Sequence, residues 1–231
     1  MARKPYQHRT GEEGFTLALV AVLLVVAAMI GATVFQKSKR DEFWNPKVET
    51  QQKLERITDV LIAYQREFQR LPCPAPLNVG TASASHGEEA ASCTGGVSTG
   101  ALPYKTLELG SDNGVDSWGN KILYAVSTGL TTGGAAYLSG TGVISVDDNG
   151  DEHTDAAFVV VSHGADRRGG YRNNATTIAI ACGTAANGTD HENCDGNDGE
   201  FVVEIMNAET GSSHYDDHLI WRLVDSAAQN M

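Results

Sequence analysis

The sequence predicts an α+β fold in which one long amino-terminal helix packs on an antiparallel β-sheet. Two observations lead to this prediction. The 231-residue chain begins with an apolar run that continues into a stripe of helical period. Beyond residue 76 it changes to short strand-like runs separated by turn-rich segments. A helix followed by a series of strands favours a sheet that buries one face against the helix.

Composition limits the classes of function. Hydrophobic residues make up 41% of the chain and charged residues 20%, so the chain can bury a core and wholesale disorder is not expected. The formal net charge is -12. Nucleic-acid-binding proteins usually carry a clustered basic surface, so this acidic balance disfavours a nucleic-acid partner.

The first element is an apolar helix. From Phe15 to Phe35, 21 consecutive residues carry no charge. A helix of this length spans roughly 30 Å, which is the thickness of bilayer hydrocarbon. We therefore divide the start of the chain into a polar leader at 1–14 and a transmembrane or assembly helix at 15–36. Basic residues are nearly balanced on the two sides, so they set the orientation only weakly.

The junction before the apolar run carries a family resemblance. A secretory signal has its small-residue cleavage site after the apolar run, whereas here Gly14 precedes it. Gly14 followed by Phe15-Thr16-Leu17 resembles the type IV prepilin signal. The resemblance implies that a prepilin peptidase cuts after Gly14, that Phe15 becomes the methylated first residue, and that the apolar helix is retained. An uncleaved single-span anchor is the alternative.

One position departs from the family pattern. Pilin-like proteins usually carry a glutamate as the fifth mature residue, where its charge is thought to pair with the amino terminus of a neighbouring subunit. Leu19 occupies this position. A carboxylate in hydrocarbon costs free energy unless it is paired. Leu19 therefore avoids this cost, and it also lacks the charge that would pair with a neighbouring subunit. Within the resemblance, this departure favours a minor subunit located at the tip of a filament.

The next segment, 37–71, predicts an amphipathic helix that enters the globular domain. Its apolar residues recur at intervals of 3, 4, 3, 4 and 3 between Leu54 and Leu71. The stripe covers fewer than three heptads, so packing on a sheet fits better than a coiled coil. Pro46 predicts a kink or break in the helix, and the prolines at 72, 74 and 76 predict its end near Leu71.

The remaining chain, 72–231, predicts a globular domain. The segment up to about Gly100 is expected to be a loop. The expected strands are Lys121 to Val126, Val143 to Val146, Phe158 to Ser162, Thr177 to Ala181, Phe201 to Met206, and Leu219 to Val224.

Four cysteines lie in this domain, namely Cys73, Cys93, Cys182 and Cys194. An even number on the far side of a membrane segment predicts a disulfide framework, with three possible connectivities. Proximity in sequence favours Cys73 with Cys93 and Cys182 with Cys194. A zinc site built from these thiols is disfavoured because no Cys-x-x-Cys occurs.

Three phrases in the domain extend the resemblance. The phrase that begins at Asp116 also predicts a turn by itself, because Asp and Asn favour a turn and Gly permits a positive φ. The insert between Gly140 and Glu200 matches no family pattern. The phrases that resemble pseudopilins of type II secretion and related pilus systems are Leu71-Pro72-Cys73-Pro74-Ala75, Asp116-Ser117-Trp118-Gly119-Asn120 and Tyr215-Asp216-Asp217.

Two acidic segments are candidate calcium sites. Asp147, Asn149 and Asp151 place oxygen donors at alternating positions, as calcium loops do, although the spacing is not that of an EF-hand. Calcium orders a carboxy-terminal loop in some pseudopilins, so the resemblance implies Ca²⁺ as a cofactor. Solvated acidic turns are the alternative reading. The second candidate set, beside Cys194, is Asn193, Asp195, Asn197 and Asp198.

The sequence offers no catalytic motif. It contains no Gly-x-Ser-x-Gly elbow, no His-Glu-x-x-His and no phosphate-binding glycine loop. Ser162 and His163 are neighbours on an expected strand, so their side chains should point to opposite faces. We therefore expect no enzyme, and the histidines are expected at turns and strand ends. A membrane-anchored periplasmic hydrolase remains a third hypothesis.

Together these features predict a pilin-like structural subunit of a type II secretion or type IV pilus-type filament. It is expected in the bacterial inner membrane, with a single span and its carboxy-terminal domain in the periplasm, and in a filament after assembly. The expected partners are other pilin-like subunits, the prepilin peptidase, membrane lipid and secreted protein cargo. The alternative is a periplasmic binding module that a single span anchors permanently.

Overall fold

The computed structural model describes residues 12–184, 188–195, 199–207 and 209–224, without the side chains of 12–18, 30–44 and 195. The chain divides into two compact units, Met1–Asn45 and Pro46–Met231. The second unit combines helices with a six-stranded sheet. The prediction of an α+β fold is therefore confirmed.

The long helix α1 runs from Glu12 to Phe68. It continues through Pro46, so of the kink or break predicted there the break is wrong, and the kink stays a prediction. A proline removes one backbone hydrogen bond, and the buried residues that follow it, Lys47 and Thr50, hold the next turns against the domain. The helix ends close to the expected position, and Gln69 then adopts a positive φ of 49°.

In the first unit, α1 exposes large aliphatic side chains, each 45% to 65% accessible. Among the described residues, no helix is both long enough and apolar enough to cross a membrane. The predicted span at 15–36 includes many side chains outside the described set and stays a prediction. The exposed side chains are Leu19, Val20, Val22, Leu23, Leu24, Val25, Val26 and Met29.

The sheet has the order β1-β2-β4-β3-β5, with β6 paired to β4. All pairs are antiparallel except β3 with β5, which is parallel, so the sheet is mixed rather than purely antiparallel. Between β3 and β5 the chain passes through β4 and the long loops after it, so β5 can run in the same direction as β3. The strands are β1 (Val97–Ala101), β2 (Leu123–Ser127), β3 (Ile144–Asp148), β4 (Asp151–Ser162), β5 (Glu200–Val203) and β6 (His218–Leu223).

Five of the six expected strands form, and β1 was not expected. The exception is the run Thr177 to Ala181, where Ile178 and Ile180 make only isolated bridges and are 42% and 49% exposed. That run has the composition of a strand but gains no extended neighbour. Four short helices complete the described elements, namely η1 (Ser111–Gly114), η2 (Thr128–Leu130), α2 (Ala135–Leu138) and α3 (His191–Asp195).

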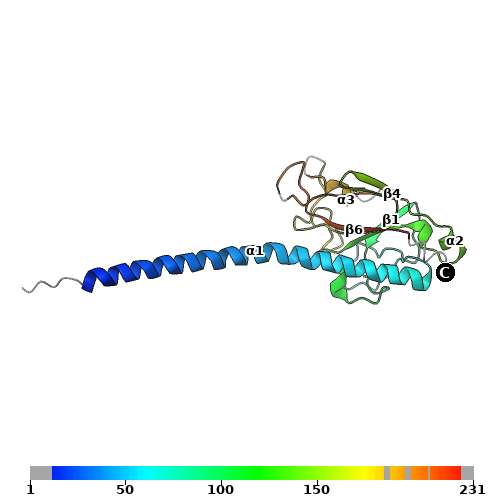
Figure 1. Cartoon of the computed structure of the whole chain (residues 1–231). Coiled ribbons are helices and arrows are strands. Elements are labelled where there is room, and N and C mark those ends of the chain that lie inside the picture. The colour runs from blue at the N-terminus through cyan, green and yellow to red at the C-terminus, as the bar shows by residue number, and fades with distance from the viewer. Residues whose placement is uncertain (1–11, 185–187, 196–198, 208, 225–231) are drawn as a thin grey trace, which may run out of the picture. The chain divides into compact units, whose positions relative to one another are not determined.

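The second half of α1 packs on the sheet, as its apolar stripe predicts. Leu54, Ile57 and Leu61 are fully buried in one cluster with side chains of β2, β4 and β6. Figure 1 shows these later turns of α1, in cyan, alongside the sheet. Full burial of a leucine or isoleucine side chain contributes about 1.5–3 kcal/mol, so this stripe fixes the helix in the domain.

Both disulfides form between the cysteines that are nearest in sequence. Cys73 bonds Cys93, and Cys182 bonds Cys194. The preference based on sequence proximity is confirmed. The first bond closes a loop directly after α1, and the second ties the segment before α3 to that helix.

The turn that begins at Asp116 also forms as its residue types predict. Asp116 Oδ1 accepts hydrogen bonds from the backbone N–H groups of Trp118 and Asn120, at 2.9 and 2.8 Å. Gly119 has a φ of 82°, the region that favours glycine. Asp116 Oδ2 accepts from the Ser162 hydroxyl at 2.7 Å, so the turn is also joined to the end of β4.

Candidate functional site

The first expected calcium segment is a tight hairpin between β3 and β4. Asn149 and Gly150 both have positive φ, at 54° and 94°, as a two-residue turn between antiparallel strands requires. Asp147 Oδ1 accepts a hydrogen bond from the Gly150 N–H at 2.7 Å. Asp151 pairs across the strands with Asp148. The turn itself therefore explains the polar residues here, and calcium binding stays a prediction.

The other expected site residues lie mostly outside the described set. Asp195 ends α3, but its side chain is not described, and Asn197 and Asp198 fall outside the described residues. The backbone of Gly14 and Phe15 belongs to α1, and their side chains are likewise outside the description. The second calcium segment and the processing site therefore remain predictions.

A different polar cluster comes together in the fold. It consists of Asp166 from the loop after β4, Asp190 from the turn before α3, and His214 and Asp216 from the segment before β6. One side-chain donor atom from each residue lies within 4.8 Å of the others. Hereafter we call these four residues the acid–histidine cluster.

Histidine lies at the centre of this cluster. His214 Nε2 is 3.3 Å from Asp166 Oδ2, 3.5 Å from Asp216 Oδ1 and 3.7 Å from Asp190 Oδ2. Arg168 Nε lies 2.7 Å from Asp166 Oδ2 and supplies a positive charge at the rim. Three carboxylates thus converge on one imidazole nitrogen.

Backbone groups orient Asp216 in the cluster. Its Oδ2 accepts hydrogen bonds from the N–H groups of Ala165 and Asp166, at 2.7 and 2.9 Å. Gly164 precedes them with a φ of 53°, and a Cβ there would lie 2.7 Å from the Asp216 carboxylate. The turn therefore requires glycine, and it leaves Asp216 Oδ1 directed at His214.

Burial raises the pKa values of two carboxylates in the cluster. Desolvation raises the pKa of Asp190 to about 6, and the neighbouring charge of Asp166 acts in the same direction. Desolvation also raises the pKa of Asp216. Both shifts show that the folded protein disfavours the charged forms of these side chains when nothing but protein surrounds them.

A second buried group adjoins the cluster. Asp217 Oδ2 accepts a hydrogen bond from Asn193 Nδ2 at 3.0 Å, and Asp217 Oδ1 lies 3.9 Å from His163 Nδ1. Desolvation raises the pKa of Asp217 well above its usual value and lowers that of His163 to about 4. The neighbouring Ser162 hydroxyl donates to Asp116 rather than to His163.

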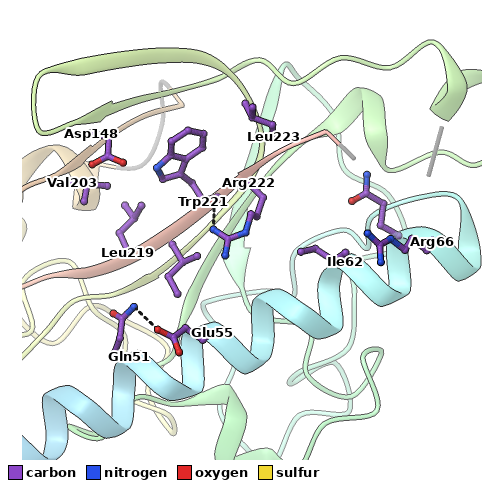
Figure 2. A pocket seen from close by; sticks show the side chains of 12 residues that line it. Gln51, Glu55, Ile62, Arg66, Asp148, Val203, Leu219, Trp221, Arg222 and Leu223 are labelled. Carbon is purple, nitrogen blue, oxygen red and sulfur yellow. Dashed lines mark hydrogen bonds between the residues drawn. The ribbon is translucent and has the colours of Figure 1, made fainter. Parts of the chain in front are cut away.

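A surface groove lies elsewhere in the second unit, between α1 and β6. Its volume is about 710 Å³. Figure 2 shows Gln51 and Glu55 of α1 on one wall and Trp221 and Arg222 of β6 on the other. Gln51 donates to Glu55 at 3.3 Å. The groove is open and mixed in polarity, so it suits contact with a protein segment better than enclosure of a small ligand.

Sequence spacing could not have indicated the acid–histidine cluster, because its members are spread over residues 166 to 216. The only local signal in the sequence was the phrase Tyr215-Asp216-Asp217, which contains one member of the cluster.

Comparison with known proteins found no family model, curated protein or solved structure that matches the chain.

Proposed function

We propose that the protein is a pilin-like structural subunit, a minor pseudopilin of a type II secretion or type IV pilus-type filament. The observation that carries the proposal is the exposed aliphatic surface of α1 between Leu19 and Met29. It is joined in one continuous helix to turns that are buried in a folded domain.

The exposed surface surrounds the helix. The five consecutive residues 22–26 are all large, aliphatic and exposed, and at about 100° per residue they cover every side of the axis. A helix that is apolar all round needs hydrocarbon or other apolar helices as neighbours. In a pilin-like subunit, membrane lipid meets this need first and the helices of neighbouring subunits meet it after assembly.

The folded domain suits the periplasmic side of the membrane. Both of its disulfides require an oxidising compartment to form and persist. Its position after the apolar helix places it outside the cytoplasm when the leader remains inside. In the assembled filament this acidic domain faces outward, where secreted cargo or other minor subunits are its partners.

Processing after Gly14 links the leader to assembly. The prepilin peptidase removes residues 1–14 at the inner face of the bilayer, and the mature chain then begins at Phe15. Leu19 lacks the charge that docks a subunit beneath the next one. This absence favours a position at the filament tip, where no subunit has to dock above.

The test is amino-terminal mass spectrometry of the chain purified from bacterial membranes that contain a prepilin peptidase. We expect the wild-type chain to begin at Phe15, and Gly14→Val to retain the leader. Gly11→Val is the matched control and should be processed normally. A wild-type chain that begins at Met1, or after residue 36, contradicts the proposal.

The groove in Figure 2 favours one alternative, a periplasmic binding module on a permanent anchor. Such a protein keeps its leader or loses it without methylation. The same mass measurement therefore separates the two functions. Methylated Phe15 at the amino terminus supports the filament subunit and excludes the permanent anchor.

A further inference from the structure

We propose that the acid–histidine cluster of Asp166, Asp190, His214 and Asp216 is a binding site for a divalent transition-metal ion of the Zn²⁺ class. This inference is independent of the filament proposal, because it rests only on the geometry of the second unit. It also differs from the calcium segments expected from the sequence, with which it shares no residue.

Unpaired oxygen atoms are the first argument. Asp190 is 3% exposed, and neither of its carboxylate oxygens accepts a hydrogen bond from any residue that the structure describes. Within the same described part of the chain, Asp216 Oδ1 and His214 Nε2 also lack hydrogen-bond partners. A buried polar group without a partner costs about 1–3 kcal/mol, and a charged one costs more. A bound cation satisfies Asp190 Oδ2, Asp216 Oδ1 and His214 Nε2 together.

The orientation of the imidazole is the second argument. His214 Nδ1 lies 3.2 Å from the Glu209 carbonyl oxygen, which can only accept a hydrogen bond. The Nδ1 atom therefore carries the proton, and in the neutral ring Nε2 presents a lone pair to the three carboxylates. Metal-binding histidines are typically held in this way, by a carbonyl or carboxylate on the second ring nitrogen.

The distances indicate the class of ion. A tetrahedral ion with bonds of about 2.0–2.2 Å sets its ligand atoms about 3.3–3.6 Å apart. The separations of 3.3, 3.5 and 3.7 Å from His214 Nε2 to the carboxylate oxygens are close to this range. Ca²⁺ takes six to eight oxygen ligands, whereas an imidazole among carboxylates suits Zn²⁺ and similar ions.

The individual carboxylates contribute differently. Among the described residues, no group donates a hydrogen bond to the Asp190 oxygens or to Asp216 Oδ1, whereas Asp166 Oδ2 forms an ion pair with Arg168. The two backbone hydrogen bonds to Asp216 Oδ2 fix the direction of its other oxygen. An ion at this position joins three chain segments, namely the loop after β4, the turn before α3 and the approach to β6.

The experiment uses the untagged full-length chain, solubilised in detergent and freed of metal by chelation. Binding of Zn²⁺ is measured by calorimetry, and the melting temperature is measured with and without it. We expect one ion per chain and a rise of about 5–10 °C when free Zn²⁺ exceeds its Kd a hundredfold. X-ray absorption of the complex should show one nitrogen and three oxygen neighbours at about 2.0–2.2 Å.

Asp190→Asn provides the sharpest variant. It should weaken Zn²⁺ binding by at least about 100-fold. Because it removes an unpaired buried charge, it should also melt at a higher temperature than metal-free wild type, so lost binding cannot be ascribed to misfolding. Asp155→Asn, which makes the same charge change at an exposed position of β4, should bind Zn²⁺ as wild type does.

Four results would overturn the assignment. The first is no change of the wild-type melting temperature with Zn²⁺, and the second is an equal change in wild type and Asp190→Asn. The third is a preference for Ca²⁺ over Zn²⁺ at this position, which would contradict the argument from the imidazole ligand. An identical response from a His214→Gln chain would also count against the site.

Discussion

Replacing Asp116 by alanine should destabilise the second unit strongly. Asp116 is 3% exposed, and its carboxylate accepts four hydrogen bonds of 2.7–3.1 Å. They come from the backbone of Trp118, the backbone and side chain of Asn120, and the hydroxyl of Ser162. The substitution removes the acceptor for all four donors, three of which belong to two fully buried residues, Asn120 and Ser162.

The magnitude follows from opposing contributions. Hydrogen bonds to a charged group contribute about 1.5–3 kcal/mol each, so four of them represent a large gross loss. Removing the carboxylate also removes its desolvation penalty, which is large enough here to raise the pKa of Asp116 against the effect of its hydrogen bonds. Breaking a buried charged network typically costs about 3–5 kcal/mol in net terms, and we expect about 3–4 kcal/mol for Asp116→Ala.

Asp116→Asn is the matched control and should cost only about 1 kcal/mol. Its amide oxygen can replace Oδ1 as the acceptor for the two backbone N–H groups. Its NH₂ group then faces Asn120, whose own Oδ1 is buried without a hydrogen-bond partner. Rotation of the Asn120 amide turns that oxygen toward the new donor and restores the contact.

Urea unfolding of the full chain, followed by tryptophan fluorescence in one detergent, measures both variants. Trp118 lies in the turn itself and packs on His218, with ring centroids 5.7 Å apart. Its emission therefore reports directly on this region. A loss below about 1 kcal/mol for Asp116→Ala, or equal losses for the two variants, would refute the view that the acceptor network holds this turn to β4.

Two further changes test the framework around this turn. Replacing both Cys73 and Cys93 by serine should lower the free energy of unfolding by about 3 kcal/mol, because the bond closes a loop with a sequence separation of 20; reduced wild-type protein, which also loses Cys182–Cys194, should be at least as unstable, and an unchanged free energy of unfolding in the variant would disprove the contribution. Burial lowers the pKa of His163 to about 4, with Asp217 and Asp166 as the facing acids, so the folded state favours the neutral ring. The contribution of neutral His163 to the free energy of unfolding should be complete above about pH 6.5 and should fall by about 3 kcal/mol as the pH drops through 4. Urea unfolding at several pH values should therefore show a smaller decrease of this free energy at acid pH for His163→Gln than for wild type. Parallel pH profiles for the two proteins would contradict the role given to His163.

Local patterns predicted much of the fold because the same residues determine both the pattern and the structure. The stripe that includes Leu54, Ile57 and Leu61 required a partner surface, and the sheet provides one. The cysteine pairs nearest in sequence were also nearest in space. In each case short-range sequence information was sufficient, since the groups that interact lie within one segment or one periodic face.

The errors arose where distant segments decide the outcome. Pro46 does not break α1, because tertiary contacts of the following turn outweigh the loss of one hydrogen bond. The strand-like run at 177–181 finds no extended neighbour, whereas Val97–Ala101, with few large apolar residues, pairs with β2. The parallel pairing of β3 with β5 joins segments that no local pattern relates.

The acid–histidine cluster differs from the calcium segment at Asp147, which stays a prediction, because no sequence pattern marked it. Asp147, which the spacing indicated, accepts a hydrogen bond from the N–H of Gly150 with its Oδ1. Asp116 accepts four hydrogen bonds. Asp190, which no motif marked, is buried, and neither of its oxygens accepts a hydrogen bond from the residues described in the structure. Turn-forming acids are satisfied locally and therefore produce recognisable motifs. An acid that stays unsatisfied after folding leaves no such signal, yet it retains the capacity to bind a cation.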